Sequence, residues 1–293
     1  MSYINSNWYI ALAFCLFFFI GGRQLAEVPG GTPKERRMIG VLLFAFSIPA
    51  LLFPLAYFPG EISISPWYNT FRSIDRIELF SALIAPAAGY TTYRKPELPY
   101  KGYHKPAVSP FMRLVKPLAF PFCVLFISIN FIGPLLRPLD SETTYEDIWT
   151  DEGVFMQSAA TASGPAALIS AMYSLNNFAD SELNAVKGTY TDQFGTEFWY
   201  LARYAVNRGY KTKFAKPSGM ENAPVPSVLS VSAYDRSRQG LGPASYIALL
   251  GRSKDGILKV GDPAYGMLEL TQLEFAYQYG DPRLIMALSF QKR

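Results

Sequence analysis

The chain has 293 residues, of which 50% are hydrophobic, and a formal net charge of +4 at pH 7. This length is sufficient for two domains. The two cysteines, Cys15 and Cys123, both lie in long apolar runs, which argues against a framework of disulfide bonds. The basic residues form no patch interleaved with aromatic residues, so the composition gives no indication of nucleic-acid binding.

Long apolar segments dominate the first half of the chain. Residues 5–22 and 38–58 carry no charge, and the last segment of this half contains only Lys116. A further segment is shorter and contains Pro86 and Gly89, and we favour a membrane span there over a re-entrant or interfacial helix. A helix needs roughly 20 apolar residues to cross the hydrocarbon core of a bilayer. The sequence therefore predicts four spans, near residues 7–22, 38–58, 78–93 and 114–136.

A signal peptide is the alternative interpretation of the first apolar segment. The residues before it contain no Lys or Arg, and no clear cleavage site of small residues follows it. We therefore expect an uncleaved membrane helix.

The charges of the loops predict the orientation of the spans. Residues 21–37 and 94–116 are rich in Lys and Arg, whereas residues 59–76 contain only two arginines. Basic loops remain on the cytoplasmic side of a membrane. We therefore expect a multi-pass protein of a bacterial inner membrane, with its N-terminus and its C-terminal domain outside the cytoplasm. The predicted division is a membrane region 1–137, an acidic linker 138–150 and a domain 151–293.

The C-terminal domain has the pattern of an α+β fold, since helices come first and strands follow with one late helix. Apolar residues at helical spacing and enrichment in β-branched and aromatic residues distinguish the two kinds of element. The predicted helices are 162–175, 196–207 and 271–279, and the predicted strands are 210–215, 227–231, 245–250, 257–260 and 284–290.

One motif in this domain is typical of cysteine proteases. Gln157 is followed, after five residues, by Ser163 at the start of an apolar helix. In a cysteine protease such a Gln donates to the oxyanion, and the N-terminus of the helix lowers the pKa of a thiol at the second position. Here a serine occupies the position of the thiol.

The domain resembles the bacteriocin-processing peptidases, a papain-like family (C39) that cuts after a Gly-Gly leader. The resemblance covers the Gln-to-nucleophile motif, a helix ending at a Gly, two strands, an Asp-Pro-Ala turn and a closing helix, in the order of the family. The matching segments are 157–168, 194–210, 226–229, 245–249, 261–266 and 270–275. The resemblance implies a papain-like fold for residues 151–293.

The resemblance also implies that the catalytic residues of the family are lost. Ser163 stands in place of the catalytic Cys, and Ser245 stands in place of the catalytic His, while Gln157 and Asp262 are retained. No cysteine follows residue 123, and no histidine follows residue 104. An Asp cannot support proton transfer without a base to orient. We expect a pseudoenzyme that has no catalytic residues, no cofactor and no metal, with these four positions converging in one cleft.

An active hydrolase that uses Ser163 is the alternative. A serine hydroxyl needs an adjacent base, and Asp262 is a poor one unless its pKa is strongly raised. The competing interpretation makes Ser163 the N-cap of a helix over 164–176, followed by Pro165 in the first turn. We favour the cap.

Three functions are consistent with these features. The first is a non-catalytic, membrane-anchored interaction module or accessory subunit, whose partners are the lipid bilayer and either other membrane subunits or a peptide ligand. The second is the hydrolase that uses Ser163. The third is transport by the membrane region, which is disfavoured because Glu78 is the main ionisable candidate within the spans.

Overall fold

The computed structural model describes residues 3–27, 32–57, 65–93, 117–128, 139, 143–231, 245–281 and 285–292. The chain forms two compact units. The α+β unit comprises Met1–Ile4, Pro59–Asp75 and Pro134–Arg293, and the helical unit comprises Asn5–Phe58 and Arg76–Gly133. The division expected from the sequence did not include the first two of these segments in the α+β unit.

The helical unit is built from apolar helices. It contains α1 (Asn7–Glu27), α2 (Pro33–Ser47), the 3-10 helices η1 (Ile48–Tyr57) and η2 (Ile77–Leu83), α4 (Ile84–Tyr93) and a helix over Pro117–Ser128. Thr32 starts α2 because its hydroxyl accepts from the backbone N–H of Glu35, whose carboxylate accepts from the N–H of Thr32.

Two helical stretches of the described chain, Asn7–Glu27 and Lys34–Phe53, are long and apolar enough to cross a membrane. The prediction of four spans is therefore supported for the first two only. The third predicted span is divided between η2 and α4. The fourth predicted span contains the shorter helix Pro117–Ser128, and its remaining residues lie outside the described part of the chain.

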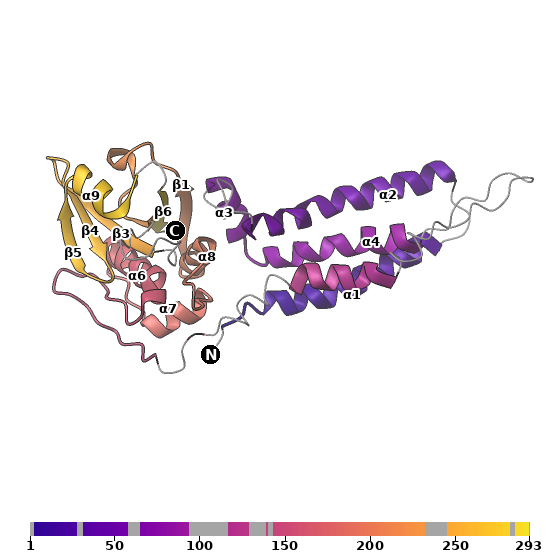
Figure 1. Ribbon diagram of the computed structural model, residues 1–293, viewed down its shortest axis with the longest axis horizontal. Coiled ribbons are helices and arrows are strands. Elements are labelled where there is room, and N and C mark those ends of the chain that lie inside the picture. Colours follow the sequence, from indigo (N-terminus) through magenta and orange to yellow (C-terminus); the bar gives the residue numbers. More distant parts are fainter. Residues whose placement is uncertain are drawn as a thin grey trace, which may run out of the picture. The chain divides into compact units, whose positions relative to one another are not determined.

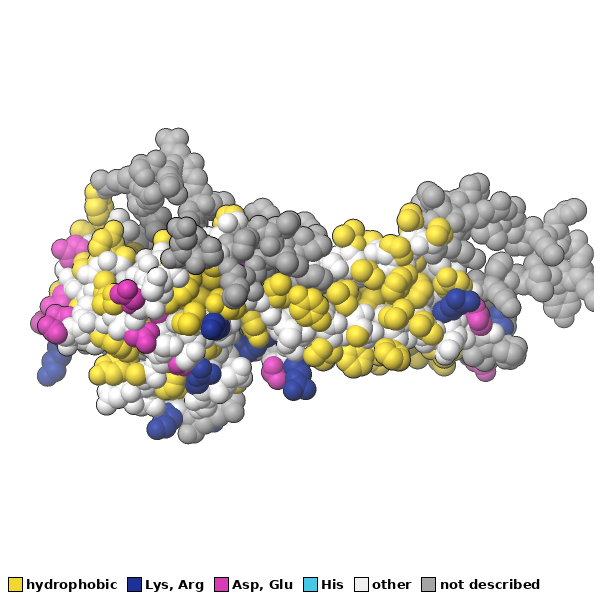
Figure 2. Space-filling view, turned by 90° about the horizontal axis from the view of Figure 1, so that it is seen from below, with side chains coloured by type: hydrophobic (Ala, Val, Ile, Leu, Met, Phe, Trp, Pro, Cys, Tyr) yellow, Lys and Arg dark blue, Asp and Glu magenta, His cyan; other side chains and the backbone are white. Residues whose placement is uncertain are grey.

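Glycines allow α1 and α4 to pack closely. A Cβ atom built on Gly22 would lie 2.1 Å from the carbonyl oxygen of Pro86, and one built on Gly89 would lie 2.3 Å from that of Phe19. Elsewhere the helices expose large apolar side chains, such as Phe17, which is 73% exposed, and Phe44, which is 63% exposed. Figure 2 shows apolar side chains spread over the visible face of the helical unit.

The α+β unit is centred on a six-stranded antiparallel sheet with the order β1-β6-β2-β3-β4-β5. Five α-helices of this unit are labelled in Figure 1. Helix α3 comes from the chain between η1 and η2, whereas α6, α7, α8 and α9 come from the C-terminal part of the chain. The strands are β1 (Tyr210–Ala215), β2 (Ser227–Val231), β3 (Ser245–Arg252), β4 (Leu258–Asp262), β5 (Gly266–Leu270) and β6 (Met286–Lys292). The helices are α3 (Pro66–Ser73), α6 (Ser163–Asn176), α7 (Glu182–Gly188), α8 (Phe198–Asn207) and α9 (Gln272–Tyr279).

The α+β order predicted for this domain is confirmed, and β1 and β2 have the predicted bounds. The other predicted strands differ by up to two residues at an end. Two α-helices and one strand of the α+β unit were not predicted, namely α3, α7 and β5. The two helices, of eight and seven residues, are too short to show a clear periodicity. Strand β5 starts directly at Gly266, whose φ of 88° belongs to the preceding turn.

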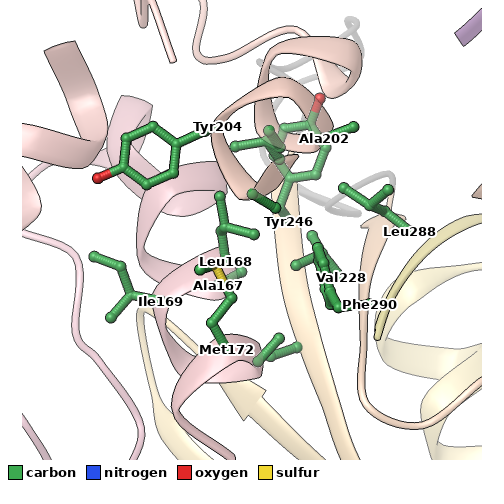
Figure 3. Close-up of a cluster of buried hydrophobic side chains, with 14 of the residues drawn as sticks. Ala167, Leu168, Ile169, Met172, Ala202, Tyr204, Val228, Tyr246, Leu288 and Phe290 are labelled. Carbon is green, nitrogen blue, oxygen red and sulfur yellow. The ribbon is translucent and has the colours of Figure 1, made fainter. Parts of the chain in front are cut away.

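Alternate side chains of the strands pack on opposite faces of the sheet. On one face, Val228, Tyr246 and Leu288 pack against α6 and α8 (Figure 3). Leu168 and Met172 of α6 belong to this cluster. On the other face, a second cluster contains strand residues such as Ile247, Leu249 and Val260, together with Phe275 and Tyr279 of α9. The candidate site lies where α6 starts, where β3 starts and where its neighbour β4 ends.

Candidate functional site

Ser163 is the first residue of α6 rather than its N-cap. A 3-10 turn over Ala160–Ala162 precedes the helix, and Ala162 occupies the cap position without a side-chain bond. The predicted cap at Ser163 is therefore wrong, because the preceding turn already directs the chain into the helix. The Ser163 side chain lies in a buried position, with 4% of the residue exposed.

The start of α6 packs directly against β3 and the segment before α8. A Cβ atom on Gly164 would lie 3.2 Å from the Tyr246 ring, 3.2 Å from Thr196 Cβ and 3.4 Å from Leu201 Cδ1. The Tyr246 hydroxyl donates to the carbonyl oxygen of Thr196 at 2.6 Å, and burial raises the pKa of Tyr246. Ser245 is the preceding residue, and it is half-buried at the start of β3.

Asp262 ends β4, the neighbour of β3. Pairing of Leu249 with Val260 places the side chains of Ser245 and Asp262 on the same face of the sheet, which is the face covered by α9. Asp262 is only 6% exposed. Its carboxylate accepts from the backbone N–H of Ala264 at 2.8 Å and from the hydroxyl of Tyr279 at 2.5 Å. Burial, together with this bond to the carboxylate, raises the pKa of Tyr279.

Gln157 lies beside the same turn, because its backbone N–H donates to the carbonyl oxygen of Pro263 at 2.9 Å. The next residue is held by a buried carboxylate. Both the N–H and the hydroxyl of Ser158 donate to Glu182, with the N–H bond measuring 2.8 Å. The N–H of Glu182 in turn donates to Asp147 Oδ1 at 2.8 Å. Burial raises the pKa of Glu182 above its ordinary range.

The structure links the four predicted positions in two pairs, each through neighbouring residues. Gln157 adjoins the turn that follows Asp262, while Ser163 and Ser245 are linked through the contact of Gly164 with Tyr246. Among the described residues, no hydrogen bond joins the side chains of these four positions directly. The convergence of all four side chains in one cleft therefore stays a prediction.

The chemistry available to this arrangement is limited. The sequence provides no histidine after residue 104 and no cysteine after residue 123, and the Asp262 carboxylate is already bonded to Tyr279. The Ser158 hydroxyl also lies beside a carboxylate, but it and the Ser158 N–H both donate to Glu182 and so hold the loop. In the described part of the chain, no group of His, Cys, Asp and Glu residues is suited to a metal ion.

Tyr279 and Glu182 were missed by the sequence analysis. Tyr279 was visible as the last residue of a predicted helix, but its partner depends on how that helix lies across the sheet. Glu182 lies in the unpredicted helix α7. In the structure it is fully buried.

Comparison with known proteins finds no matching family model and no matching curated protein. Among solved structures, the peptidase domain of Streptococcus ComA, a bi-functional ABC transporter involved in a quorum-sensing pathway, is 18% identical, with a TM-score of 0.39. The match covers 47% of this chain and 96% of that domain. The peptidase domain of Streptococcus mutans ComA is also 18% identical over 47% of this chain and 98% of that domain, with a TM-score of 0.35.

A double-glycine-motif protease from an AMS/PCAT transporter, solved in complex with a leader peptide, is 14% identical. That match covers 54% of this chain and 98% of the protease, with a TM-score of 0.39. All three matched chains are peptidase domains or proteases. The similarity extends over about half of the chain, and the chemistry of the site is judged from its own residues.

Proposed function

We propose that this protein is a non-catalytic, membrane-anchored, peptidase-like protein that binds a peptide or another membrane protein. The observation that carries the proposal is the chemistry of the positions that match the catalytic residues of the peptidase family. Within the described residues, the buried Ser163 at the start of α6 has no imidazole or thiol partner, and Asp262 is engaged by Tyr279. Such a site retains a scaffold for binding but lacks a nucleophile–base pair.

Membrane anchoring is supported by the helical unit. Its first two apolar stretches are long enough to span a bilayer, and they expose side chains such as Phe17 and Phe44. Exposed aromatic and aliphatic surface of this extent is expected to face lipid or a partner. The proposed site is a bacterial inner membrane, and the basic loops 21–37 and 94–116 favour an orientation with the α+β unit outside the cytoplasm.

A peptide is the ligand class favoured by the comparisons. The similar proteins are peptidase domains or proteases, one of them from a bi-functional ABC transporter, and another was solved with a leader peptide. We therefore propose that the surface around the start of α6 receives an extended peptide segment, either free or presented by a larger membrane assembly.

Binding and cleavage are separated by one experiment on the full-length protein in mild detergent. A peptide that ends its leader in Gly-Gly is added, and both its binding and its hydrolysis are followed for the wild type and for Ser163→Ala. We expect the two proteins to behave alike, with no hydrolysis. Hydrolysis by the wild type that disappears in Ser163→Ala would establish the alternative hydrolase.

The same detergent preparation tests the accessory-subunit role. Proteins that co-elute with the wild type through two successive purification steps are identified by mass spectrometry. We expect stoichiometric membrane subunits. A protein that elutes alone and also fails to retain peptide would contradict the proposal.

Transport by the membrane region is less well supported. Glu78 is fully buried within the helical unit and accepts a hydrogen bond from Asn7 Nδ2 at 3.3 Å. A single bonded carboxylate at the start of η2 is not sufficient for a transport pathway across the membrane.

A further inference from the structure

The helix α3 is an integral part of the α+β unit, although it comes from the segment that separates the second and third apolar segments. Ser65 starts the helix by accepting from the N–H of Tyr68. Tyr68 is fully buried, and its ring meets the ring of Trp199 on α8 edge to face at 6.2 Å. The contact joins residues that are far apart in the sequence.

Arg72 anchors α3 to α8. It is 3% exposed, and its guanidinium carbon lies 4.3 Å from the centre of the Trp199 ring. The same guanidinium donates to the Tyr68 hydroxyl at 3.0 Å, while Arg203 of α8 donates to the backbone oxygen of Arg72 at 2.6 Å. A cation buried over a Trp face with bonded neighbours is a specific contact.

A second contact connects α3 to the sheet. Asn69 is 1% exposed, and its Nδ2 lies 3.7 Å from Sδ of Met286 on β6. The N-terminal segment is also part of the unit, since Tyr3 packs against a cluster of Leu139, Ala162 and Val186. The α+β unit is thus completed by two segments from the apolar half of the chain.

We propose that the α+β unit assembles on one side of the membrane from three stretches of chain, and that the helical unit is therefore inserted as two hairpins. This inference rests on the proposed membrane anchoring. The hairpins are Asn5–Phe58 and Arg76–Gly133, and each begins and ends next to a segment of the α+β unit. An open six-stranded sheet has unpaired backbone groups along its edge strands, so this unit cannot lie across a bilayer and each hairpin crosses an even number of times.

Two independent features of the chain bear on this topology. One is the packing of α3 and Tyr3 within the α+β unit, and the other is the content of Lys and Arg in the loops. Both place residues 59–75 and the C-terminal part on the same side. In this arrangement α3 fastens the connection between the two hairpins to the α+β unit.

Protection of a thiol in intact membranes tests the docking of α3. In a background with Cys15→Ala and Cys123→Ala, single cysteines at Asn69 and at Thr70 are treated with a maleimide before and after denaturation. We expect Asn69→Cys, at a position that is 1% exposed, to react only after denaturation. The matched variant Thr70→Cys, at an exposed position of α3, should react in both states. Equal reaction of the two variants before denaturation would overturn the docking.

Labelling with a membrane-impermeant maleimide tests the hairpins. Single cysteines at Thr70 and Lys292 should be labelled from the same side of the membrane, and one at Lys101 only after permeabilisation. A sodium carbonate wash of the same membranes distinguishes two failures. Release of the protein by carbonate would refute membrane anchoring. Retention with positions 70 and 292 labelled from opposite sides would refute the hairpins while leaving the anchoring intact.

Discussion

At the scale of single residues, Asp262 is a buried carboxylate that is held by neighbouring donors. In the family that the motifs resemble, an Asp at this position orients an imidazole. Here its carboxylate is buried and receives hydrogen bonds from Tyr279 and Ala264 instead. A buried carboxylate without donors is costly, so Tyr279 explains why this position tolerates an Asp when no histidine is present.

Removal of the Tyr279 hydroxyl should therefore destabilise the α+β unit. We expect Tyr279→Phe to lower the free energy of unfolding by about 1–3 kcal/mol, because Asp262 remains buried with one donor fewer. The control is Tyr265→Phe, since Tyr265 is 74% exposed. Chemical denaturation followed by intrinsic fluorescence would measure both variants. Equal stabilities for the two would mean that the bond between Tyr279 and Asp262 contributes nothing.

Glu182 gives the α+β unit a dependence on pH. Burial raises the pKa of Glu182 in the folded state above the unfolded value of about 4.3. Below about pH 4.3 the group is protonated in both states, and at higher pH the unfolded state ionises first. The stability of the wild type relative to Glu182→Gln should therefore fall as the pH rises from 4 through the raised pKa. A stability difference independent of pH across this window would contradict the expected shift.

At the scale of elements, helix starts differ in how much their first polar residue contributes. Thr271 caps α9, and its hydroxyl accepts from the N–H of Glu274 at 3.2 Å. Ser163 makes no such bond at the start of α6. We expect Thr271→Ala to cost about 1 kcal/mol, and Ser163→Ala to cost clearly less. A thermal unfolding series that reversed this order would indicate a capping role for Ser163.

The pairing of α1 with α4 depends on glycine. Because a Cβ on Gly22 would approach the oxygen of Pro86 to 2.1 Å, Gly22→Ala must push the two helices apart. The adjacent Gly21 has no atom within 4 Å of a built Cβ, so Gly21→Ala provides a matched control. We expect Gly22→Ala, but not Gly21→Ala, to lower the melting temperature of the protein in detergent. Similar melting curves for both variants would show that α1 and α4 do not pack closely.

At the scale of the whole molecule, the membrane orientation can be tested by reporters. Alkaline phosphatase is active only outside the cytoplasm, and we expect activity when it is fused after Arg293. A fusion within residues 94–116 should be inactive, because that loop carries Arg94, Lys95, Lys101 and Lys105 among its basic residues. Activity of the loop fusion together with an inactive C-terminal fusion would reverse the orientation.

Local sequence determined a large part of this protein. Apolar runs located α1 and α2, periodicity and turn residues located α6, α8, α9 and most strands, and the composition alone showed that the C-terminal half lacks cysteine and histidine. These features depend on residues close together in the chain, so a pattern in the sequence is enough to reveal them.

Only the tertiary structure decided which distant residues meet. Arg203 and Arg72 are 131 positions apart, and Tyr279 and Asp262 are 17 apart. The membership of α3 in the α+β unit and the bond that occupies Asp262 arise from these contacts. The contacts of α1 with α4 through Gly22 and Gly89 also join separate segments. No local pattern encodes such contacts, because each depends on how two elements lie against each other once the core has formed.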